Sequence, residues 1–227
     1  MKKGISVILA VLLAVSCLTG LSGCGSSKKT TLYVYNWGQY ISEGDDGSLD
    51  VIAAFEEAYP NIRVQYSTYD SNEIMYSKLA NGGITVDVII PSDYMIGRMV
   101  QEGMLEELNF SNIPNYQYID DSFKNTSYDP ENKYSVPYTW GTLGIIYNTT
   151  MVSQPITSWS AMFDPQYAGQ VLMINNSRDA LAAALLYLGY SINTTDESQL
   201  EEAFALLKQA KDSGVYQAFV MDEVFQK

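Results

Sequence analysis

The segment VDVIIPSDYM, residues 86–95, contains the change of pattern that decides the fold. Residues 86–90 form a short and nearly unbroken apolar run, which is typical of a strand covered by protein on both faces. Pro91 interrupts this run, and Ser92 is suited to cap a helix that ends before Gly103. The segment therefore predicts a buried strand followed directly by a helix.

The same order of elements occurs twice before this segment. Residues 32–35 alternate as a strand does, and residues 49–59 carry their apolar side chains on one helical stripe. A second strand is predicted at 62–66, and a second helix over 71–79 begins with Ser71 as its capping residue. Repeated strand–helix order is typical of an α/β fold, in which helices cover both faces of a parallel sheet.

A second α/β unit is predicted to start near Pro137, after an irregular stretch at 109–133 that is rich in Asn, Asp, Ser, Pro and Tyr. The helix at 178–188 is apolar nearly all round, which indicates deep burial. The predicted elements of this unit are a strand at 143–147, a short helix at 158–163, a strand at 171–174 and helices at 178–188 and 197–211.

The first 23 residues carry the pattern of a signal peptide. Lys2 and Lys3 form a basic start, residues 5–18 are almost entirely apolar, and small residues precede Cys24. The stretch LSGC, residues 21–24, resembles the lipobox of bacterial lipoproteins, in which the cysteine is acylated and becomes the new N-terminus. Cys24 is therefore the predicted lipidation site. The alternative is an ordinary signal peptide that ends by chance at a cysteine.

Composition excludes several kinds of chemistry. Residues 24–31 are expected to be the lipidated cysteine and a polar tether, and Cys17 lies in the removed leader, so neither a disulfide nor thiol catalysis is expected. The chain has no histidine, which excludes His-based acid–base chemistry and His-ligated metal sites. No phosphate-binding loop, dinucleotide fingerprint or zinc-ligand cluster occurs, so no cofactor and no metal are expected.

The chain is strongly acidic. Its formal net charge is −13, and loss of Lys2 and Lys3 with the leader makes the charge −15. Such a surface repels nucleic acid and anionic lipid headgroups and attracts cations over long range. The same charge also occurs in secreted proteins for solubility alone, and composition does not separate the two explanations.

Aromatic and polar side chains follow the first and third predicted strands. YNWGQYIS, residues 35–42, leaves the first strand, and residues 91–94 leave the third. Ligands of parallel sheets bind beyond the carboxyl ends of the strands, so both loops are expected at one edge. Rings such as Trp37 and Tyr40 either seal the top of a core there or form the wall of a pocket.

These motifs, in their order and spacing, resemble the spermidine/putrescine-binding proteins that serve bacterial ABC importers. The resemblance extends from residue 31 to about residue 225, and it implies a type II periplasmic-binding-protein-like fold with a ligand cleft between two α/β lobes. The lobes would be residues 32–136 and 137–227, the second incomplete, with a hinge near 136–138. The matching segments are YNWGQYIS, STYDSNEIMYSKLANGG, VDVIIPSDYM, YSVPYTWGTLGIIYN, PITSWSAMFDPQYAG and NNSRDA.

The resemblance also implies a set of ligand-binding residues. Trp37 would stack on the ligand and Tyr40 would use its ring and hydroxyl. Two residues correspond to a pair of acids at the start of a helix, although one of them is an asparagine and carries no charge. The implied residues are Trp37, Tyr40, Ser92, Tyr94, Asn176 and Asp179.

Structural roles are the alternative for most of these residues. Ser92 is suited to helix capping, Tyr94 to packing, and Asn176 and Asp179 to capping of the later helix. Under the ligand-binding interpretation, Trp37→Ala is expected to weaken binding by more than about tenfold, as loss of a cation–π partner would, and to leave the fold intact.

The implied ligand is a polyamine, and the implied partners are a membrane permease and, through lipid on Cys24, the outer face of the cell membrane. Nucleic acid is not an expected partner, and the protein is expected to be a monomeric binding protein, not an enzyme. Family members continue beyond the point that matches Lys227, so this chain is expected to be C-terminally truncated and to bind polyamine poorly.

Two other functions stay open on the sequence alone. A sugar-binding protein of an ABC importer would use the same aromatic platforms. A carboxylate-based hydrolase would need a second acid facing Asp179, and the sequence identifies none. A sensory role would use the same binding chemistry as transport.

Overall fold

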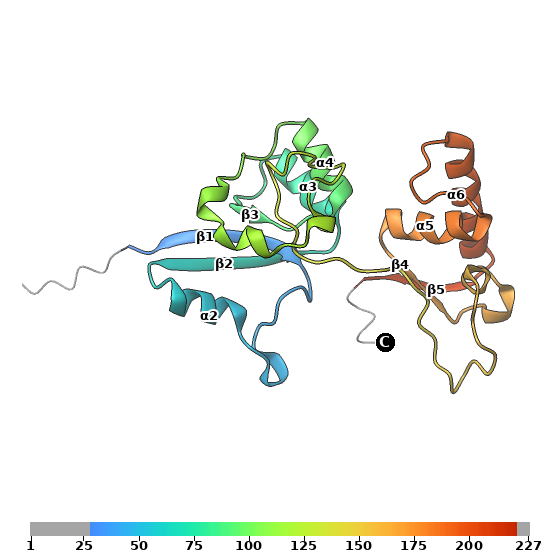
Figure 1. Ribbon diagram of the computed structural model, residues 1–227. Helices are drawn as coiled ribbons and strands as arrows, with labels where there is room; N and C mark the ends of the chain where they lie inside the picture. The colour runs from blue at the N-terminus through green and yellow to red at the C-terminus, as the bar shows by residue number, and fades with distance from the viewer. Residues whose placement is uncertain (1–27, 222–227) are drawn as a thin grey trace, which may run out of the picture. The chain divides into compact units, whose positions relative to one another are not determined.

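The computed structural model describes residues 28–221 (Figure 1). The predicted signal peptide, Cys24 and the first part of the tether lie outside the described residues. Within residues 28–221, no helix combines the length and the apolar character needed to span a membrane.

Contacts divide the chain into two compact units, which are described separately. Of the described residues, the first unit contains 28–32 together with Glu43–Gln65, and the second contains Tyr33–Ser42 together with 66–221. The boundary near Pro137 that the sequence suggests is a different division of the chain, and it stays a prediction.

The main helix of the first unit is α2, Val51–Ala58. Asp50 caps this helix, because its Oδ1 accepts the backbone N–H of Ala53 at 2.8 Å. Glu56 Oε1 accepts the N–H of Val64 at 2.8 Å, which joins the helix to the strand that follows it. The helix predicted at 49–59 is confirmed and is slightly shorter than expected.

A three-stranded sheet contains β1 (Thr30–Trp37), β2 (Ile62–Tyr69) and β3 (Val88–Ile89), in the order β2-β1-β3. β1 and β3 are parallel, with Tyr35 opposite Ile89. The predicted parallel pairing is therefore confirmed for these two strands. Because both strands point the same way, the loops that follow them leave the sheet at one edge.

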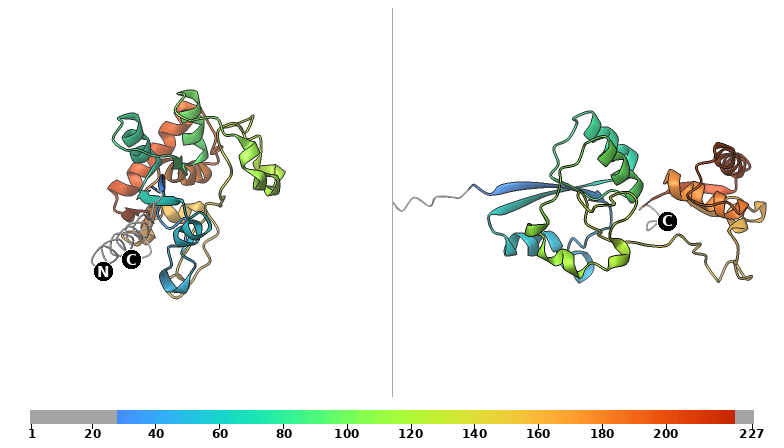
Figure 2. Two further views of the ribbon diagram at one scale, coloured as in Figure 1. Left: turned by 90° about the vertical axis from the view of Figure 1, so that its left-hand side faces the viewer. Right: turned by 45° about the horizontal axis from the view of Figure 1, so that its top comes forward.

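Helices α3 (Asn72–Ala80) and α4 (Asp93–Gln101) lie side by side over one face of β1 and β3 (Figure 2). Ser71 caps α3 as predicted, because its Oγ accepts the N–H of Ile74 at 3.2 Å. Ser92 occupies the capping position of α4, but its side chain makes no capping hydrogen bond. The predicted position of Ser92 is thus confirmed, and its predicted capping bond is wrong.

The core under these helices is built on aromatic rings and methionines. Tyr69 stands at its centre, with ring centroids 4.9 Å from Tyr35 and 4.9 Å from Trp37. Its hydroxyl donates to the carbonyl of Ile90, the residue after β3, at 2.5 Å. The buried residues of this first core cluster are Tyr35, Trp37, Tyr69, Met75, Met95 and Met99.

The irregular stretch after α4 is organised by a buried carboxylate. Asp129 is almost fully buried and accepts the backbone N–H groups of Lys133, Tyr134 and Ser135 at 2.9–3.0 Å. The hydroxyl of Ser135 donates to it as well, at 2.8 Å. Burial acts to raise the pKa of Asp129, but these hydrogen bonds outweigh it and hold the pKa below its usual value.

The later part of the second unit contains β4 (Val171–Ile174), α5 (Ser177–Leu188), α6 (Glu197–Asp212) and β5 (Tyr216–Val220). β4 and β5 are parallel, and both helices lie on the same face of this pair (Figures 1 and 2). β5 was not predicted. The buried residues of this second core cluster are Met173, Ala180, Ala184, Leu185, Ala203 and Leu207.

Helix α5 corrects the prediction of burial on all sides. Ala183 and Ala184 are buried, but Leu186 and Tyr187 are more than two-fifths exposed. One stripe of α5 packs into the second core cluster, while the opposite stripe stays open. Tyr187 is covered in part by Phe163, whose ring centroid lies 5.2 Å away.

The strand predicted at 143–147 is not formed, and that prediction is wrong. Ile146 is fully exposed, and Leu143 is partly so. No strand within residues 28–221 pairs with this segment, and a strand without a neighbour leaves its backbone hydrogen bonds unmade. The short helix predicted at 158–163 is a single 3-10 turn, Trp159–Met162.

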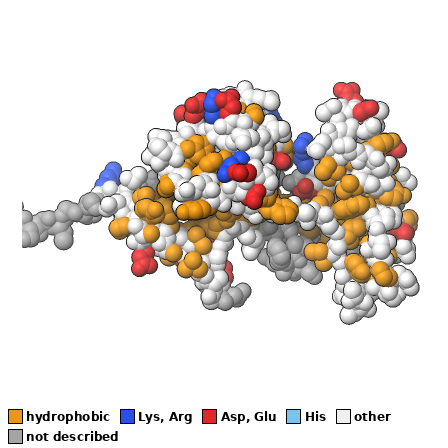
Figure 3. All heavy atoms as spheres, in the orientation of Figure 1, with side chains coloured by type: hydrophobic (Ala, Val, Ile, Leu, Met, Phe, Trp, Pro, Cys, Tyr) orange, Lys and Arg blue, Asp and Glu red, His pale blue; other side chains and the backbone are white. Residues whose placement is uncertain are grey.

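Much of the surface on the face drawn in Figure 3 is apolar. Several of the exposed apolar side chains belong to the segment between the two core clusters, where the predicted strand is absent. They are Val136, Tyr138, Trp140, Leu143, Ile146 and Met151.

Candidate functional site

The loop after β1 separates the roles of its two predicted site residues. Trp37 is only 7% exposed and belongs to the first core cluster. Tyr40 is 43% exposed, and its ring centroid lies 6.1 Å from that of Trp37. Gln39 adopts a left-handed conformation with φ of 59°, which forms the turn between them. Trp37 therefore packs mainly in the core, and Tyr40 has the more exposed ring of the two.

Tyr138 joins this loop, although sequence reasoning did not select it. Its ring stacks on Tyr40 with centroids 6.3 Å apart, and its hydroxyl donates to the Tyr40 carbonyl at 2.5 Å. Tyr138 lies in the segment that the sequence assigned to the hinge, so its aromatic character was the available signal. Trp140, two residues on, pairs with Phe123 at 5.8 Å and remains largely exposed.

The loop after β3 holds Ser92 and Tyr94 by hydrogen bonds to the start of α3. The N–H of Ser92 donates to Asn72 Oδ1 at 3.1 Å, and Asn72 Nδ2 donates to the Tyr94 hydroxyl at 2.9 Å. The Tyr94 hydroxyl donates in turn to Glu73 Oε1 at 2.8 Å. Burial is the main cause that raises the pKa of Tyr94 to about 12. The hydrogen bond from Asn72 lowers this pKa, and the hydrogen bond to Glu73 raises it.

The start of α5 meets the ring of Tyr94. The guanidinium carbon of Arg178 lies 4.8 Å from the centroid of this ring, a cation–π distance. Burial raises the pKa of Asp179, the negative charge of Asp93 raises it further, and Arg178 acts in the opposite direction. Arg178 thus lies on the Tyr94 ring and also interacts with Asp179, which interacts in turn with Asp93. Sequence reasoning had identified neither Arg178 nor Asp93.

Asn176 has the structural role that the sequence offered as the alternative. It is the capping residue of α5, and its Oδ1 accepts the N–H groups of Arg178 and Asp179 at 3.0 and 3.3 Å. The negative end of its side chain therefore points at the helix backbone. Asp179 in the first turn offsets part of the positive helix dipole there.

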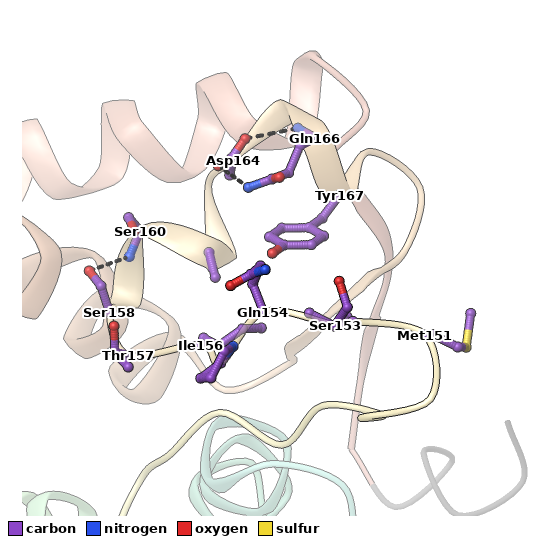
Figure 4. A pocket seen from close by; sticks show the side chains of 13 residues that line it. Met151, Ser153, Gln154, Ile156, Thr157, Ser158, Ser160, Asp164, Gln166 and Tyr167 are labelled. Atoms are coloured by element: carbon purple, nitrogen blue, oxygen red, sulfur yellow. Dashed lines mark hydrogen bonds between the residues drawn. The ribbon is translucent and has the colours of Figure 1, made fainter.

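A separate pocket lies away from these residues. It has a volume of about 440 Å³ and is lined by residues between Met151 and Tyr167 (Figure 4). Asp164 is already engaged, because its carboxylate accepts the backbone and side-chain N–H groups of Gln166 at 2.9 and 2.6 Å. None of the six predicted site residues lines this pocket.

The part of the chain that the structure describes contains no candidate metal site. Across residues 28–221, no group of three His, Cys, Asp or Glu side chains has the geometry to hold a metal ion. The candidate site is the set of aromatic rings and carboxylates at the loops after β1 and β3 and at the start of α5.

Comparisons with known proteins agree on one kind of relative. The sequence profile described as "Bacterial extracellular solute-binding protein" matches residues 50–223. The spermidine/putrescine-binding periplasmic protein of Salmonella typhimurium is 37% identical over 201 residues, which are 87% of this chain and 56% of that protein.

Solved structures give the same result. The putative spermidine/putrescine ABC transporter protein from Listeria monocytogenes superimposes with a TM-score of 0.78 at 41% identity, covering 86% of this chain and 58% of that one. The TpPotD lipoprotein of Treponema pallidum superimposes with a TM-score of 0.74 at 34% identity, covering 86% and 59%. The chain thus spans between half and two thirds of the length of these relatives.

Proposed function

The chain belongs to the family of bacterial extracellular solute-binding proteins, and from this premise we propose that it captures polyamines and delivers them to an ABC importer. Its fold is of the periplasmic-binding-protein type that the sequence predicted. The family works outside the cytoplasm. Spermidine and putrescine, which two of the similar proteins carry in their names, are the proposed ligands.

The chemistry of a polyamine suits the candidate site. Such a ligand is a flexible methylene chain carrying ammonium groups, and each ammonium that leaves water needs an anionic or aromatic partner. A cation over an aromatic ring contributes about 0.5–2 kcal/mol, depending on desolvation. The rings of Tyr40, Tyr138 and Tyr94 supply faces, and Asp93 and Asp179 supply negative charge.

One observation carries the proposal. The guanidinium of Arg178 lies over the Tyr94 ring, and its charge acts on Asp179, so this ring already holds an organic cation. A ligand ammonium has the same charge as Arg178, so it repels this guanidinium and takes its place on the ring. The proposed ligand-binding residues remain Trp37, Tyr40, Ser92, Tyr94, Asn176 and Asp179, to which the structure adds Tyr138 and Arg178 as neighbours.

Calorimetric titration of the full-length protein tests this function. Spermidine and putrescine are expected to bind, and their affinity is expected to fall steeply between low and high salt, since screening weakens charge pairing. Maltose serves as the neutral comparison. Tight maltose binding that is indifferent to salt, without polyamine binding, would establish a sugar-binding protein instead.

Membrane attachment through Cys24 is the second part of the proposal. The LSGC sequence supports it, and the relative from Treponema pallidum is itself described as a lipoprotein. Residues 25–31 would then let the binding lobes stand off the membrane, and a hinge near residues 136–138 would close them. Cys24→Ser is expected to move the protein from the membrane fraction to the soluble fraction after cell lysis.

The remaining proposals concern partners and activity. The protein acts as a monomer that docks on a membrane permease, and it catalyses no reaction. Its similar proteins are named as binding proteins and transporter components, which supports a carrier and not an enzyme.

A further inference from the structure

We propose that Asn72 is a positioning residue for the polyamine site, which sets ligand affinity through Ser92 and Tyr94 without touching the ligand. The inference rests on the proposed function for its binding readout. The structural observation behind it is that the buried side-chain amide of Asn72 holds both the backbone of Ser92 and the ring of Tyr94 in the loop after β3.

The hydrogen bonds of Asn72 reach two different parts of that loop. Asn72 is the first residue of α3 and is completely buried. Its Oδ1 accepts the N–H of Ser92 at 3.1 Å, and its Nδ2 donates to the hydroxyl of Tyr94 at 2.9 Å. Both ends of the amide are therefore used, and burial leaves little room for water to replace them.

The chain of bonds also has a direction. Because Asn72 donates to the Tyr94 oxygen, the Tyr94 proton is free to go to Glu73 Oε1, which accepts it at 2.8 Å. An amide is the side-chain group that offers an acceptor to Ser92 and a donor to Tyr94 at once; an ionised carboxylate offers acceptors alone. The residue type at position 72 therefore determines how the hydroxyl of Tyr94 is held.

Fixing the hydroxyl fixes the ring. The opposite, aromatic part of Tyr94 is the face on which Arg178 lies at 4.8 Å. Because two partners hold the ring at its hydroxyl, a cation that takes the place of Arg178 on this face binds without further loss of Tyr94 side-chain entropy. Supporting residues of this kind typically change affinity by about 10- to 100-fold in metal sites when removed, and we take the lower value as the scale here.

A double-mutant cycle in the full-length protein tests the route through Tyr94. Asn72→Ala is expected to raise the Kd for spermidine by about tenfold in the wild-type background. With Tyr94→Phe already present, the hydroxyl is gone, and the same exchange is expected to change the Kd far less. Equal losses in both backgrounds would overturn the route through Tyr94 and leave Ser92 as the only connection between Asn72 and the loop.

The control variant is Asn81→Ala. Asn81 ends the same helix, is exposed, and bonds its side chain to Ser77. It reports any general effect of weakening α3, and its spermidine affinity is expected to stay at the wild-type value. A loss equal to that of Asn72→Ala would mean that helix stability, and not positioning, sets the affinity.

A ligand-free measurement separates this inference from the proposed function. Asn72→Ala is expected to accelerate hydrogen exchange at the Ser92 amide, because the acceptor of that N–H is removed. Unchanged exchange overturns the positioning role even if spermidine binds. If the wild-type protein binds no polyamine, the proposed function fails. The hydrogen-exchange rate of the Ser92 amide still shows whether Asn72 holds this loop.

Asn72→Asp covers the case in which the alanine variant does not fold. It keeps the shape and the acceptor for Ser92 but loses the donor to Tyr94, whose single hydroxyl proton then serves only one of the two carboxylates at positions 72 and 73. Added negative charge by itself would strengthen polyamine binding, whereas a less firmly held Tyr94 would weaken it. Weaker spermidine binding supports the proposal, and equal or stronger binding contradicts it.

Discussion

The ring of Tyr138 is stacked on that of Tyr40, and the Tyr138 hydroxyl donates to the Tyr40 backbone carbonyl. These residues are ninety-eight positions apart in the sequence. The pair therefore ties the loop after β1 to the segment that is proposed to act as the hinge. It makes an aromatic surface that belongs to no single element.

Tyr138→Ala is expected to weaken spermidine binding several-fold, because both its ring face and its support of Tyr40 are lost. Tyr138→Phe keeps the ring and removes one exposed hydrogen bond, with a net value of about 0.5–1.5 kcal/mol at most. It is expected to stay close to wild type in calorimetry. Tyr118→Ala, at a highly exposed tyrosine, is the control. Equal affinity for all three variants would remove Tyr138 from the site.

Tyr40→Ala and Trp37→Ala are expected to differ in what they damage. Trp37 is buried against Tyr69, and truncation of a buried tryptophan costs about 3–5 kcal/mol of unfolding free energy. Tyr40 is 43% exposed, so its truncation is expected to reduce binding while costing much less stability. Urea denaturation and calorimetry on both variants separate these effects. An unaltered unfolding midpoint for Trp37→Ala would contradict the burial of its ring.

We expect Asp179 to make spermidine binding depend on pH. Its pKa is raised by burial and by Asp93, so the folded protein holds its proton more tightly than the unfolded chain does. As the pH falls through this raised pKa, the carboxylate becomes neutral and its attraction for an ammonium is lost. Calorimetry over a pH series is expected to show wild-type affinity falling more steeply than that of Asp179→Asn. Parallel curves would exclude Asp179 as an ionised partner.

The same raised pKa has a consequence for stability. An ionised Asp179 costs folding free energy above its raised pKa, and this cost disappears once the pH is below the usual aspartate value of about 3.9. Asp179→Asn is therefore expected to unfold at a higher temperature than wild type near neutral pH, with the difference vanishing in acid.

Asn176 separates capping from ligand binding. Asn176→Ala removes the acceptor for two backbone N–H groups and is expected to cost about 0.5–2 kcal/mol of stability. Asn176→Asp keeps the cap and places a charge at the helix start, which is expected to add about 0.3–1 kcal/mol. The Asp variant is also expected to bind spermidine more tightly than wild type. An unchanged Kd would confine Asn176 to its capping role.

Asp129 is expected to make the fold less stable in acid, whereas protonation of Asp179 in acid is expected to remove a cost to stability. Its lowered pKa means that the ionised carboxylate stabilises the fold above the usual aspartate pKa, and this stabilisation is lost as the pH falls through the lowered value. Asp129→Asn is expected to cost about 1–3 kcal/mol near neutral pH, since buried N–H groups lose their acceptor. Urea denaturation is expected to show that the difference in unfolding free energy between Asp129→Asn and the wild type becomes smaller in acid.

Asp121→Asn is the matched control for this experiment. Asp121 lies on the same irregular stretch, and its side chain is 95% exposed in a pair with Lys124. Exposed pairs contribute about 0–1 kcal/mol, so a small and pH-independent change is expected. A loss as large as that of Asp129→Asn would show that the stretch responds to any lost charge.

The first half of the fold could be predicted because its signals are local. The apolar run at 86–90 and the capping position of Ser92 define β3 and α4 within a few residues of sequence. The strand at 143–147 has an equally apolar sequence, but a strand also needs a neighbour, and sequence alone does not supply one. β5 was missed although Tyr216, Ala218 and Val220 alternate, because the run is short and follows a long helix.

The site was harder to predict than the fold because its members meet by tertiary contact. Because Trp37 and Tyr40 both lie in the loop after β1, the sequence predicts both as site residues. Only the packing of Trp37 against Tyr69 shows which of the two rings is buried. Arg178 sits two residues after the predicted Asn176, and nothing in its local pattern indicates that it reaches Tyr94. Asn72 looks like an ordinary first residue of a helix, and its role depends on a loop twenty residues away.

The segment around Ile146 has a practical consequence for anyone who handles this chain. Apolar side chains such as Ile146 are exposed to solvent there, on a segment that pairs with no strand within residues 28–221. Unpaired apolar backbone of this kind can pair with a second copy of the chain. We expect concentrated samples to self-associate through this segment. Replacing Ile146 with a charged residue is expected to reduce this self-association, and it would disturb neither of the two core clusters.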